Sequence, residues 1–295
     1  MLTVVCSVLP FLIALSQSTQ FQAVREFTPS RLAIEGNTLE NYRLLIQALP
    51  SYWRNFWNSL YVSTLAAFGA ALVSGLAGFS FAVLEFPAKR LLFGVVMCTM
   101  VFPAMSTAIP YLIEMRILNW LDTPRALWLP SCVSALGVFL VRQYALNALP
   151  KTMIEAARVD GTNNWGLFRR IGLPNLMPVL ITVALLVFVT SWNHLDAAFY
   201  VIQSLETRLL TDALGLLTAV QARTSFTPGG QIVSLLNPAI LGASLGMLPV
   251  FLIYLLCANQ LGHGLGISQD GWCPRVSLQS VLSRLQAWVK NLQKS

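Results

Sequence analysis

Long apolar runs separated by short polar segments dominate this chain. Six runs approach or reach the roughly 20 residues that a helix needs to cross the hydrocarbon core of a bilayer. Backbone groups inside a bilayer must satisfy their own hydrogen bonds, and the runs lack the short alternating pattern of a barrel, so they predict helices. The expected fold is all-α, a polytopic membrane helix bundle with six transmembrane helices at about 1–16, 57–84, 91–113, 126–146, 177–200 and 238–260.

The first run, residues 1–16, has two interpretations. It is short, contains Pro10 and has no basic residue before it. A signal peptide has an apolar region of this length, but it also has a positive start and a small-residue cleavage site. The run has neither feature, which favours a first transmembrane helix.

The second run carries small residues at four-residue spacing. These are Ala66, Ala70, Ser74 and Gly78. Small residues at this spacing let helix backbones approach closely in lipid, so the pattern indicates a packing face. Generic membrane composition is the alternative explanation.

The third run contains Pro103 and Pro110. Proline removes a backbone donor and bends a helix. Irregular backbone inside a membrane is tolerated only against protein or water, so such a break would line a pathway. A merely bent packing helix is the alternative.

A compact polar block, residues 150–172, lies between the fourth and fifth runs. Pro150 suits a helix's first turn, where its missing N–H costs nothing. The helix is expected to run from Lys151 to Asp160 and to stop at Gly161, the residue type suited to a left-handed C-terminal cap.

A second short helix is expected at about 164–171, after a cap by Thr162 or Asn163. It should end before Gly172 and Pro174. The block contains no nucleophile, no metal-ligand set and no phosphate loop, so its expected chemistry is recognition. Two short helices joined by a fixed glycine turn could also transmit a movement of a bound partner to the rest of the chain.

Composition and charge agree with a membrane protein and give it an orientation. Apolar residues make up 56% of the 295 and charged residues only 11%, whereas soluble domains carry about 25% charged residues. With a cytoplasmic N-terminus, the inner segments hold eleven basic and four acidic residues, and the outer segments hold eight of each. The net charge of +7 therefore falls on the inner side. The short inner loops are basic, which is the bias that the positive-inside rule counts. No basic patch is interleaved with exposed aromatics, which argues against nucleic-acid binding.

Titratable and metal-ligating residues exclude several classes of site. The five cysteines form no CxxC pair, so neither a metal site nor a disulfide framework is expected. Ionisable groups are scarce within the apolar runs, which speaks against an ion-coupled secondary carrier. It also speaks against a membrane enzyme, which needs a convergent acid–base set.

The polar block resembles the EAA loop of bacterial ATP-binding cassette (ABC) importer permeases. The resemblance rests on Glu155-Ala156-Ala157, Asp160-Gly161, Phe168, Ile171, Leu173-Pro174 and Pro178. Further matches favour the carbohydrate type, similar to the second permease subunit of the maltose transporter family: Asn41-Tyr42, Asn58-Ser59-Leu60, Pro103, Arg142-Gln143, Pro150 and Trp192-Asn193.

The resemblance covers about residues 1–266, taken as the transmembrane permease domain with its coupling loop at 150–174. It implies a type I ABC importer permease fold in the bacterial plasma (inner) membrane, with both termini cytoplasmic. It also implies a second homologous permease, a cytoplasmic ABC ATPase dimer that binds ATP and Mg²⁺, and an extracytoplasmic solute-binding protein. This chain would be no enzyme, and would hold no cofactor or metal of its own. The implied ATPase-docking residues are Glu155, Ala156, Ala157, Asp160, Gly161, Phe168, Ile171 and Pro174.

The transported solute is expected to be a sugar or sugar derivative. Permeases for polyamines, phosphate or amino acids share the same loop and are the alternative. Asn193, Ser106 and Thr107 are the candidates for the substrate pathway, because they are polar and lie on predicted spans. Residues 272–295 form an additional tail, whose apolar residues at three- and four-residue steps predict an amphipathic cytoplasmic helix on the inner membrane surface.

Overall fold

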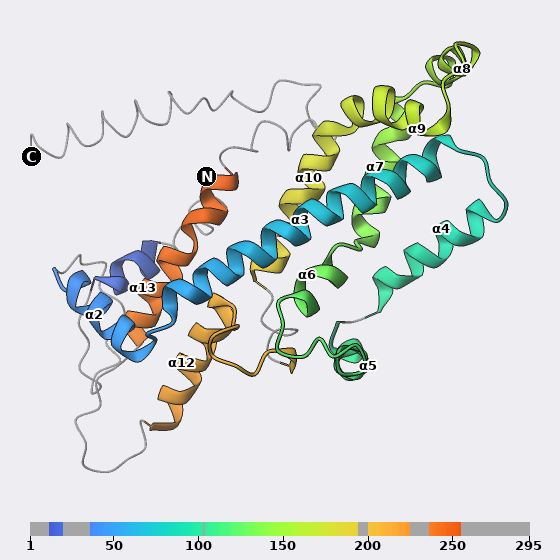
Figure 1. Ribbon diagram of the computed structural model, residues 1–295. Coiled ribbons are helices and arrows are strands. Elements are labelled where there is room, and N and C mark those ends of the chain that lie inside the picture. Colours follow the sequence, from blue (N-terminus) through green and yellow to red (C-terminus); the bar gives the residue numbers. More distant parts are fainter. Residues whose placement is uncertain (1–11, 20–35, 103, 194–199, 225–235, 255–295) are drawn as a thin grey trace, which may run out of the picture. The chain divides into compact units, whose positions relative to one another are not determined.

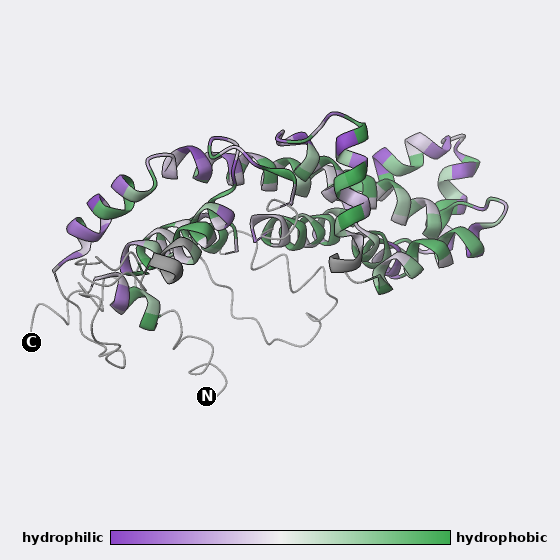
Figure 2. Ribbon diagram, turned by 90° about the horizontal axis from the view of Figure 1, so that it is seen from below, coloured by the Kyte–Doolittle hydropathy of each residue, from purple (hydrophilic) through white to green (hydrophobic). Residues whose placement is uncertain are grey.

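A computed structural model describes residues 12–19, 36–102, 104–193, 200–224 and 236–254 (Figure 1). These residues are almost entirely helical and contain no strand, which confirms the predicted all-α class. Hydrophobic residues run along the long helices (Figure 2). The elements are α2 (Thr38–Ala48), α3 (Tyr52–Val83), α4 (Lys89–Cys98), η1 (Thr99–Val101), α5 (Ala104–Ile117), α6 (Arg125–Ser131), α7 (Ala135–Ala148), α8 (Lys151–Val159), α9 (Asn164–Leu167), η2 (Phe168–Gly172), α10 (Leu173–Trp192), α12 (Leu210–Thr224) and α13 (Leu236–Gly246).

Four helical stretches are long and apolar enough to cross a membrane, and each overlaps a predicted span. They are Tyr52–Val83, Arg125–Ala148, Asn164–Trp192 and Leu236–Tyr254. The first predicted span, 1–16, lies mostly outside the described residues, as does the whole predicted tail, 272–295. The count of six spans therefore stays a prediction.

The third predicted span, 91–113, is wrong as a single helix. The apolar run is divided into α4, the short 3₁₀ turn η1 and α5. Phe102, between η1 and α5, has φ −71° and ψ 124°, an extended conformation. The residue before a proline is pushed away from the helical region, and Phe102 precedes Pro103. Pro110, by contrast, lies inside α5 without ending it.

One compact unit comprises described residues within 1–63, 105–128 and 190–250. In it α13 packs against both α2 and α12. The Tyr52 hydroxyl donates a 2.8 Å hydrogen bond to the carbonyl of Gly242, which ties the start of α3 to α13. A buried apolar cluster of Val62, Leu127, Ile202 and Leu209 joins α3, α6 and the segment before α12.

The second compact unit comprises described residues within 64–104, 129–189 and 251–295. Its centre is the second half of α3, whose Ala66, Ala70 and Ser74 are fully buried. A Cβ atom on Gly78 would lie 2.6 Å from the Val141 Cβ of α7 and 3.0 Å from the Arg142 nitrogen. The small residues on α3 are therefore a packing face, which decides against generic membrane composition.

Gly78→Ala should destabilise the second compact unit. The new methyl group would force α3 and α7 apart, and overpacking of this kind costs about 1–3 kcal/mol. That cost exceeds the gain of about 1 kcal/mol from replacing a helical glycine by alanine. The matched control is Gly94→Ala on α4, where a Cβ meets nothing within 4 Å. Thermal unfolding in detergent should give a lower midpoint for Gly78→Ala and an unchanged or higher one for Gly94→Ala. Equal shifts would contradict the close approach.

Candidate functional site

The first helix of the polar block, α8, has one inward and one outward face. Pro150 occupies its N-cap position with φ −58° and ψ 144°. Ile154 and Ala157, three residues apart, are buried. Glu155 and Ala156, which lie between them in sequence, are exposed. The helix is therefore anchored through one face and presents the other.

The predicted glycine corner is present at Gly161. Its φ is +77°, in the left-handed region that side chains with a Cβ rarely adopt. The N–H of Thr162 donates to the Ala157 carbonyl, and the N–H of Gly161 donates to the Arg158 carbonyl, both at 3.0 Å. This pair of bonds is the Schellman arrangement that closes a helix end. A Cβ on Gly161 would meet nothing within 4 Å, so the backbone angle alone calls for glycine there.

The second helix begins as predicted but does not stop where predicted. The Asn163 side-chain oxygen accepts a 2.7 Å hydrogen bond from the N–H of Gly166, which caps α9. The helix then passes through the π-turn η2 into α10, so the expected end before Gly172 is wrong. A π-helical turn contains one residue more than an α-helical turn, which changes the pairing of N–H and C=O groups along the helix. Pro174, two residues after η2, has no N–H to donate, and the changed pairing lets the helix continue through it. The Asn175 side chain donates to the Ile171 carbonyl at 2.8 Å.

Aromatic rings connect the block to α3. The Trp165 ring lies 5.7 Å from the Phe168 ring, between centroids. The Phe168 ring in turn meets Phe79 of α3 edge to face at 5.3 Å. A Cβ on Gly172 would lie 2.8 Å from the Phe79 ring, so the glycine lets η2 sit directly on α3.

The predicted docking residues divide into two groups. Glu155, Ala156, Asp160, Gly161 and Pro174 are exposed. Ala157 and Phe168 are 7% and 8% exposed and pack within the chain, and Ile171 is half-buried.

Two exposed apolar residues on the block were not among the predicted docking residues. Val159 is 87% exposed and Trp165 is 60% exposed. Trp165, Phe168 and Ile171 follow one another at three-residue steps, which would place them along one edge of a regular helix. The structure instead exposes Trp165 and buries Phe168. Val159 could have been found from its place in α8, because it is five residues from Ile154 and therefore off the buried face.

The candidate substrate residues are not brought into one described site. Asn193 is exposed just after α10, and Thr107 is exposed on α5. The backbone of Ser106 lies in α5, but its side chain is outside the described residues. Within the described ranges, no group of three or more His, Cys, Asp or Glu side chains could hold a metal ion.

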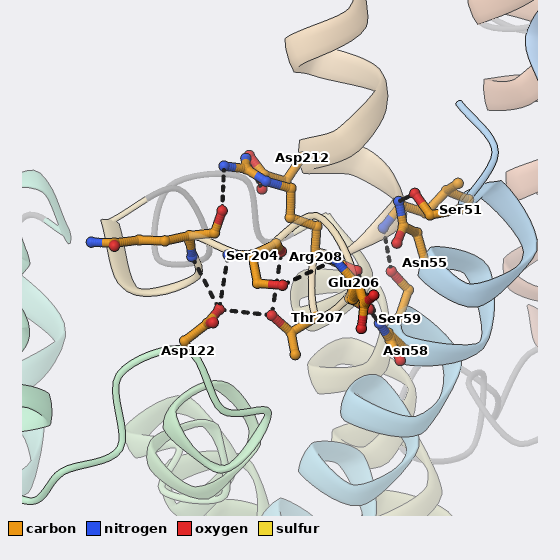
Figure 3. Close-up of polar contacts among 12 residues, drawn as sticks. Ser51, Asn55, Asn58, Ser59, Asp122, Ser204, Glu206, Thr207, Arg208 and Asp212 are labelled. Atoms are coloured by element: carbon orange, nitrogen blue, oxygen red, sulfur yellow. Dashed lines mark hydrogen bonds and ion pairs between the residues drawn. The ribbon is translucent and has the colours of Figure 1, made fainter. Parts of the chain in front are cut away.

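A polar cluster in the first compact unit gathers around Asp122 (Figure 3). Its carboxylate accepts hydrogen bonds from the N–H groups of Gln203 and Ser204, at 3.2 and 3.0 Å, and from the Thr207 hydroxyl at 2.7 Å. Partial burial acts to raise the pKa of Asp122. The hydrogen bonds and the charge of Arg208 outweigh it and hold that pKa below its ordinary value.

Residues of α3 hold the other side of the same loop. The Asn58 side chain donates to the Glu206 carbonyl at 2.8 Å, and the Ser59 hydroxyl accepts from the Leu210 N–H at 2.8 Å. Next to them Arg208 forms a 2.8 Å ion pair with Asp212, whose side chain is buried. Asn58 and Ser59, noted in the sequence as part of a resemblance, therefore fasten the loop before α12.

Comparison with known proteins identifies the family. Residues 74–261, more than half of the chain, match the family of binding-protein-dependent transport system inner membrane components. The chain belongs to this family. The permease is thus a multi-pass membrane protein of transport, not an enzyme, and the predicted resemblance is confirmed.

Individual relatives and a solved structure agree. The permease is 30% identical over 241 residues to the arabinooligosaccharides transport system permease protein AraQ of Halalkalibacterium halodurans, covering 82% of this chain and 80% of that protein. It is 28% identical over 210 residues to the lactose transport system permease protein LacG of Rhizobium radiobacter, covering 71% and 72%. A chain of a bacterial ABC transporter involved in the import of the acidic polysaccharide alginate matches with a TM-score of 0.73 and 18% identity, over 88% of this chain and 92% of that chain. This likeness concerns the fold, and it confirms the expected type I ABC importer permease architecture.

Asp122→Asn should loosen the loop at residues 203–207. The carboxylate charge strengthens three hydrogen bonds, and its loss should lower local stability by about 1 kcal/mol at this solvent-facing position. Hydrogen exchange of the peptide spanning the loop should become faster at neutral pH, while Glu40→Gln, an exposed residue on α2, leaves it unchanged.

The pH dependence has a definite sign. The folded pKa of Asp122 is lowered, so its contribution is present above the ordinary value of 3.8 and is lost as pH falls through the lower, folded value. The wild type should therefore resemble Asp122→Asn only in strong acid. Equal loop exchange in the two proteins at pH 7 would rule out this role.

Proposed function

We propose that this permease carries a sugar or sugar derivative across the bacterial plasma membrane, as a subunit of an ATP-driven, binding-protein-dependent importer. One observation carries the proposal. An exposed block, α8 with its glycine corner and Trp165, is built rigidly onto the membrane-spanning helix α10 and stacked on α3 through Phe168 and Phe79. A partner that moved this block would move these helices with it.

In this proposal residues 150–172 seat in a cleft of a cytoplasmic ABC ATPase dimer. Glu155, Asp160 and the backbone at Gly161 would form the polar part of the contact, and Ala156, Val159 and Trp165 its apolar part. Ala157, Phe168 and Ile171 would act from inside, by fastening the block to the bundle. ATP and Mg²⁺ would be bound and hydrolysed on the ATPase, and Pro174 would mark where the block joins α10.

Movement of the block can reach the bundle by two covalent routes. The helix continues through η2 into α10, and on the other side Leu149 and Pro150 join α8 to α7. Both α7 and α10 pack closely on α3, at Gly78 and Gly75. Packed helices of this kind switch between discrete arrangements rather than deforming continuously, which suits alternating access.

A second homologous permease would cover the broken helix α4–η1–α5. Leu91, Val101 and Ile109 on this segment are strongly exposed. The segment is interrupted at Phe102, and a backbone break at membrane depth must face protein or water rather than lipid. Asn193, Ser106 and Thr107 are the residues proposed to meet the solute along the pathway, which an extracytoplasmic binding protein would supply.

The proposal places both termini and the polar block on the cytoplasmic side. The distribution of basic residues supports this orientation. Similarity to permeases of arabinooligosaccharide and lactose transport systems supports a sugar as the solute.

A reconstituted importer tests the function. The permease, its genomic-neighbour permease and ATPase, and the binding protein are placed in liposomes with radiolabelled arabinotriose or lactose. Uptake should require ATP inside the liposome. Glu155→Lys should abolish uptake while the protein stays inserted, because this exposed side chain has no part in the fold. Glu40→Lys on α2 is the matched charge reversal and should transport normally. Uptake without ATP, or normal uptake by Glu155→Lys with the ATPase bound, would refute the proposal.

Trp165→Ala should weaken binding of the ATPase. Exposed tryptophans that enter a partner's pocket contribute about 2 kcal/mol or more to binding, so affinity should fall by an order of magnitude or more. The control is Trp57→Ala on α3, since Trp57 is 61% exposed and also touches a single phenylalanine at 5.7 Å. Co-purification and titration of the ATPase measure the effect. Similar losses for both variants would exclude Trp165 from the contact.

A further inference from the structure

Arg142 and Phe93 form a specific contact that the function proposed above leaves unused. The guanidinium carbon of Arg142, on α7, lies 4.4 Å from the centre of the Phe93 ring, on α4. A cation within about 6 Å of an aromatic face is attracted by the ring's quadrupole. The Phe93 ring also meets Phe81, at the end of α3, edge to face at 5.4 Å. Phe81 in turn lies 5.7 Å from Phe86, in the turn that leads to α4.

This contact matters because α4 is otherwise weakly held. None of its residues is buried, and Leu91 and Val95 are strongly exposed. Both α4 and η1 pack against α7. Arg142 therefore lies where the exposed segment α4–η1 meets the rest of the second compact unit.

The other side of the contact is rigid. Val141 is fully buried, and the backbone nitrogen of Arg142 lies next to Gly78 of α3. Arg142 is six residues before α7 ends at Ala148, and α8 begins three residues later at Lys151. A displacement of α8 thus reaches Arg142 through less than two turns of helix and one short connection.

We propose that Arg142 is a positioning residue that makes α4 move together with the coupling block, through its guanidinium face on Phe93. This inference rests on the proposed function, since it needs the block to be moved by an ATPase. Arginine suits the role because its planar guanidinium group stacks on aromatic rings. The helix that would move is α4, which continues through η1 to the helix break at Phe102.

The distance between α4 and α7 tests the proposal directly. Spin labels are placed at Val95 and Leu146, exposed residues of the two helices, in a variant whose cysteines are replaced. The assembled complex is measured without nucleotide and with a non-hydrolysable ATP analogue. The wild type should give one narrow distance in both states. Arg142→Met and Phe93→Leu should broaden it, or shift it by about 1–2 Å, in at least one state.

Further variants separate a positioning role from simple destabilisation. Phe93→Trp retains an aromatic ring that binds cations well, so this variant should give the same narrow distance as the wild type. Arg90→Met removes a neighbouring exposed charge from α4 and should behave as wild type. In the liposome assay Arg142→Met and Phe93→Leu should each lower uptake per ATP hydrolysed by about three- to fivefold, and the double variant should fall no further.

The outcomes are distinguishable from failure of the function itself. Wild-type distances and wild-type uptake in Arg142→Met and Phe93→Leu, with Glu155→Lys still inactive, would overturn only this inference. Loss of assembly in Arg142→Met together with unchanged distances in Phe93→Leu would also overturn it, since Arg142 would then be structural. Absence of ATP-dependent uptake in the wild type would instead remove the function on which the inference rests.

Discussion

Close approach of helices along the second half of α3 is the constraint on which the polar block, residues 150–172, depends. Ala70, Ser74 and Gly78 are small, and a Cβ on Gly78 would lie only 3.0 Å from the backbone nitrogen of Arg142, so α7 lies very close to α3. In lipid there is no hydrophobic gain from bringing apolar helices together, and contact of this kind must come from packing. The same helix then receives Phe168 and Gly172 of the block at Phe79. Because α3 is the common surface, the block cannot shift without α7, α10 or α3 responding.

In the first compact unit, polar side chains stabilise a loop by hydrogen-bonding to its backbone. Asp122, Asn58 and Ser59 come from segments far apart in sequence, and all three hold the stretch between Gln203 and Leu210. Their partners are backbone groups and a hydroxyl of the loop, together with the N–H of Leu210 at the start of α12, which has no acceptor within its own helix. An unpaired backbone group costs free energy when it is shielded from water, so side chains that pair it stabilise the loop. The polar pattern here maintains a loop conformation rather than building a reactive centre.

The sequence predicted features that depend on local chemistry and missed those that depend on how turns combine. Gly161 was placed correctly because only a left-handed residue closes α8. The cap of the second helix was narrowed to Thr162 or Asn163, and the structure selects Asn163, whose side chain reaches the N–H of Gly166. The break at Phe102 could also have been predicted, since Pro103 restricts the residue before it. The hydropathy of residues 91–113, taken alone, predicted one continuous span across that break. Burial of Ala157 could not be seen, because it depends on which face of α8 meets the bundle.

The π-turn explains why the apolar edge of the second helix divides into an exposed and a buried part. In a regular α-helix, residues seven apart lie on nearly the same face, so Trp165 would point the same way as Gly172, toward Phe79. The wider turn at η2 takes up about one extra residue, which is about 100° of rotation. It keeps Phe168 near the face of Gly172 and turns Trp165 away from it, and Trp165 is accordingly exposed while Gly172 is buried. One irregular turn thus lets a single continuous helix bury the Phe168 ring against α3 and present the Trp165 ring outward.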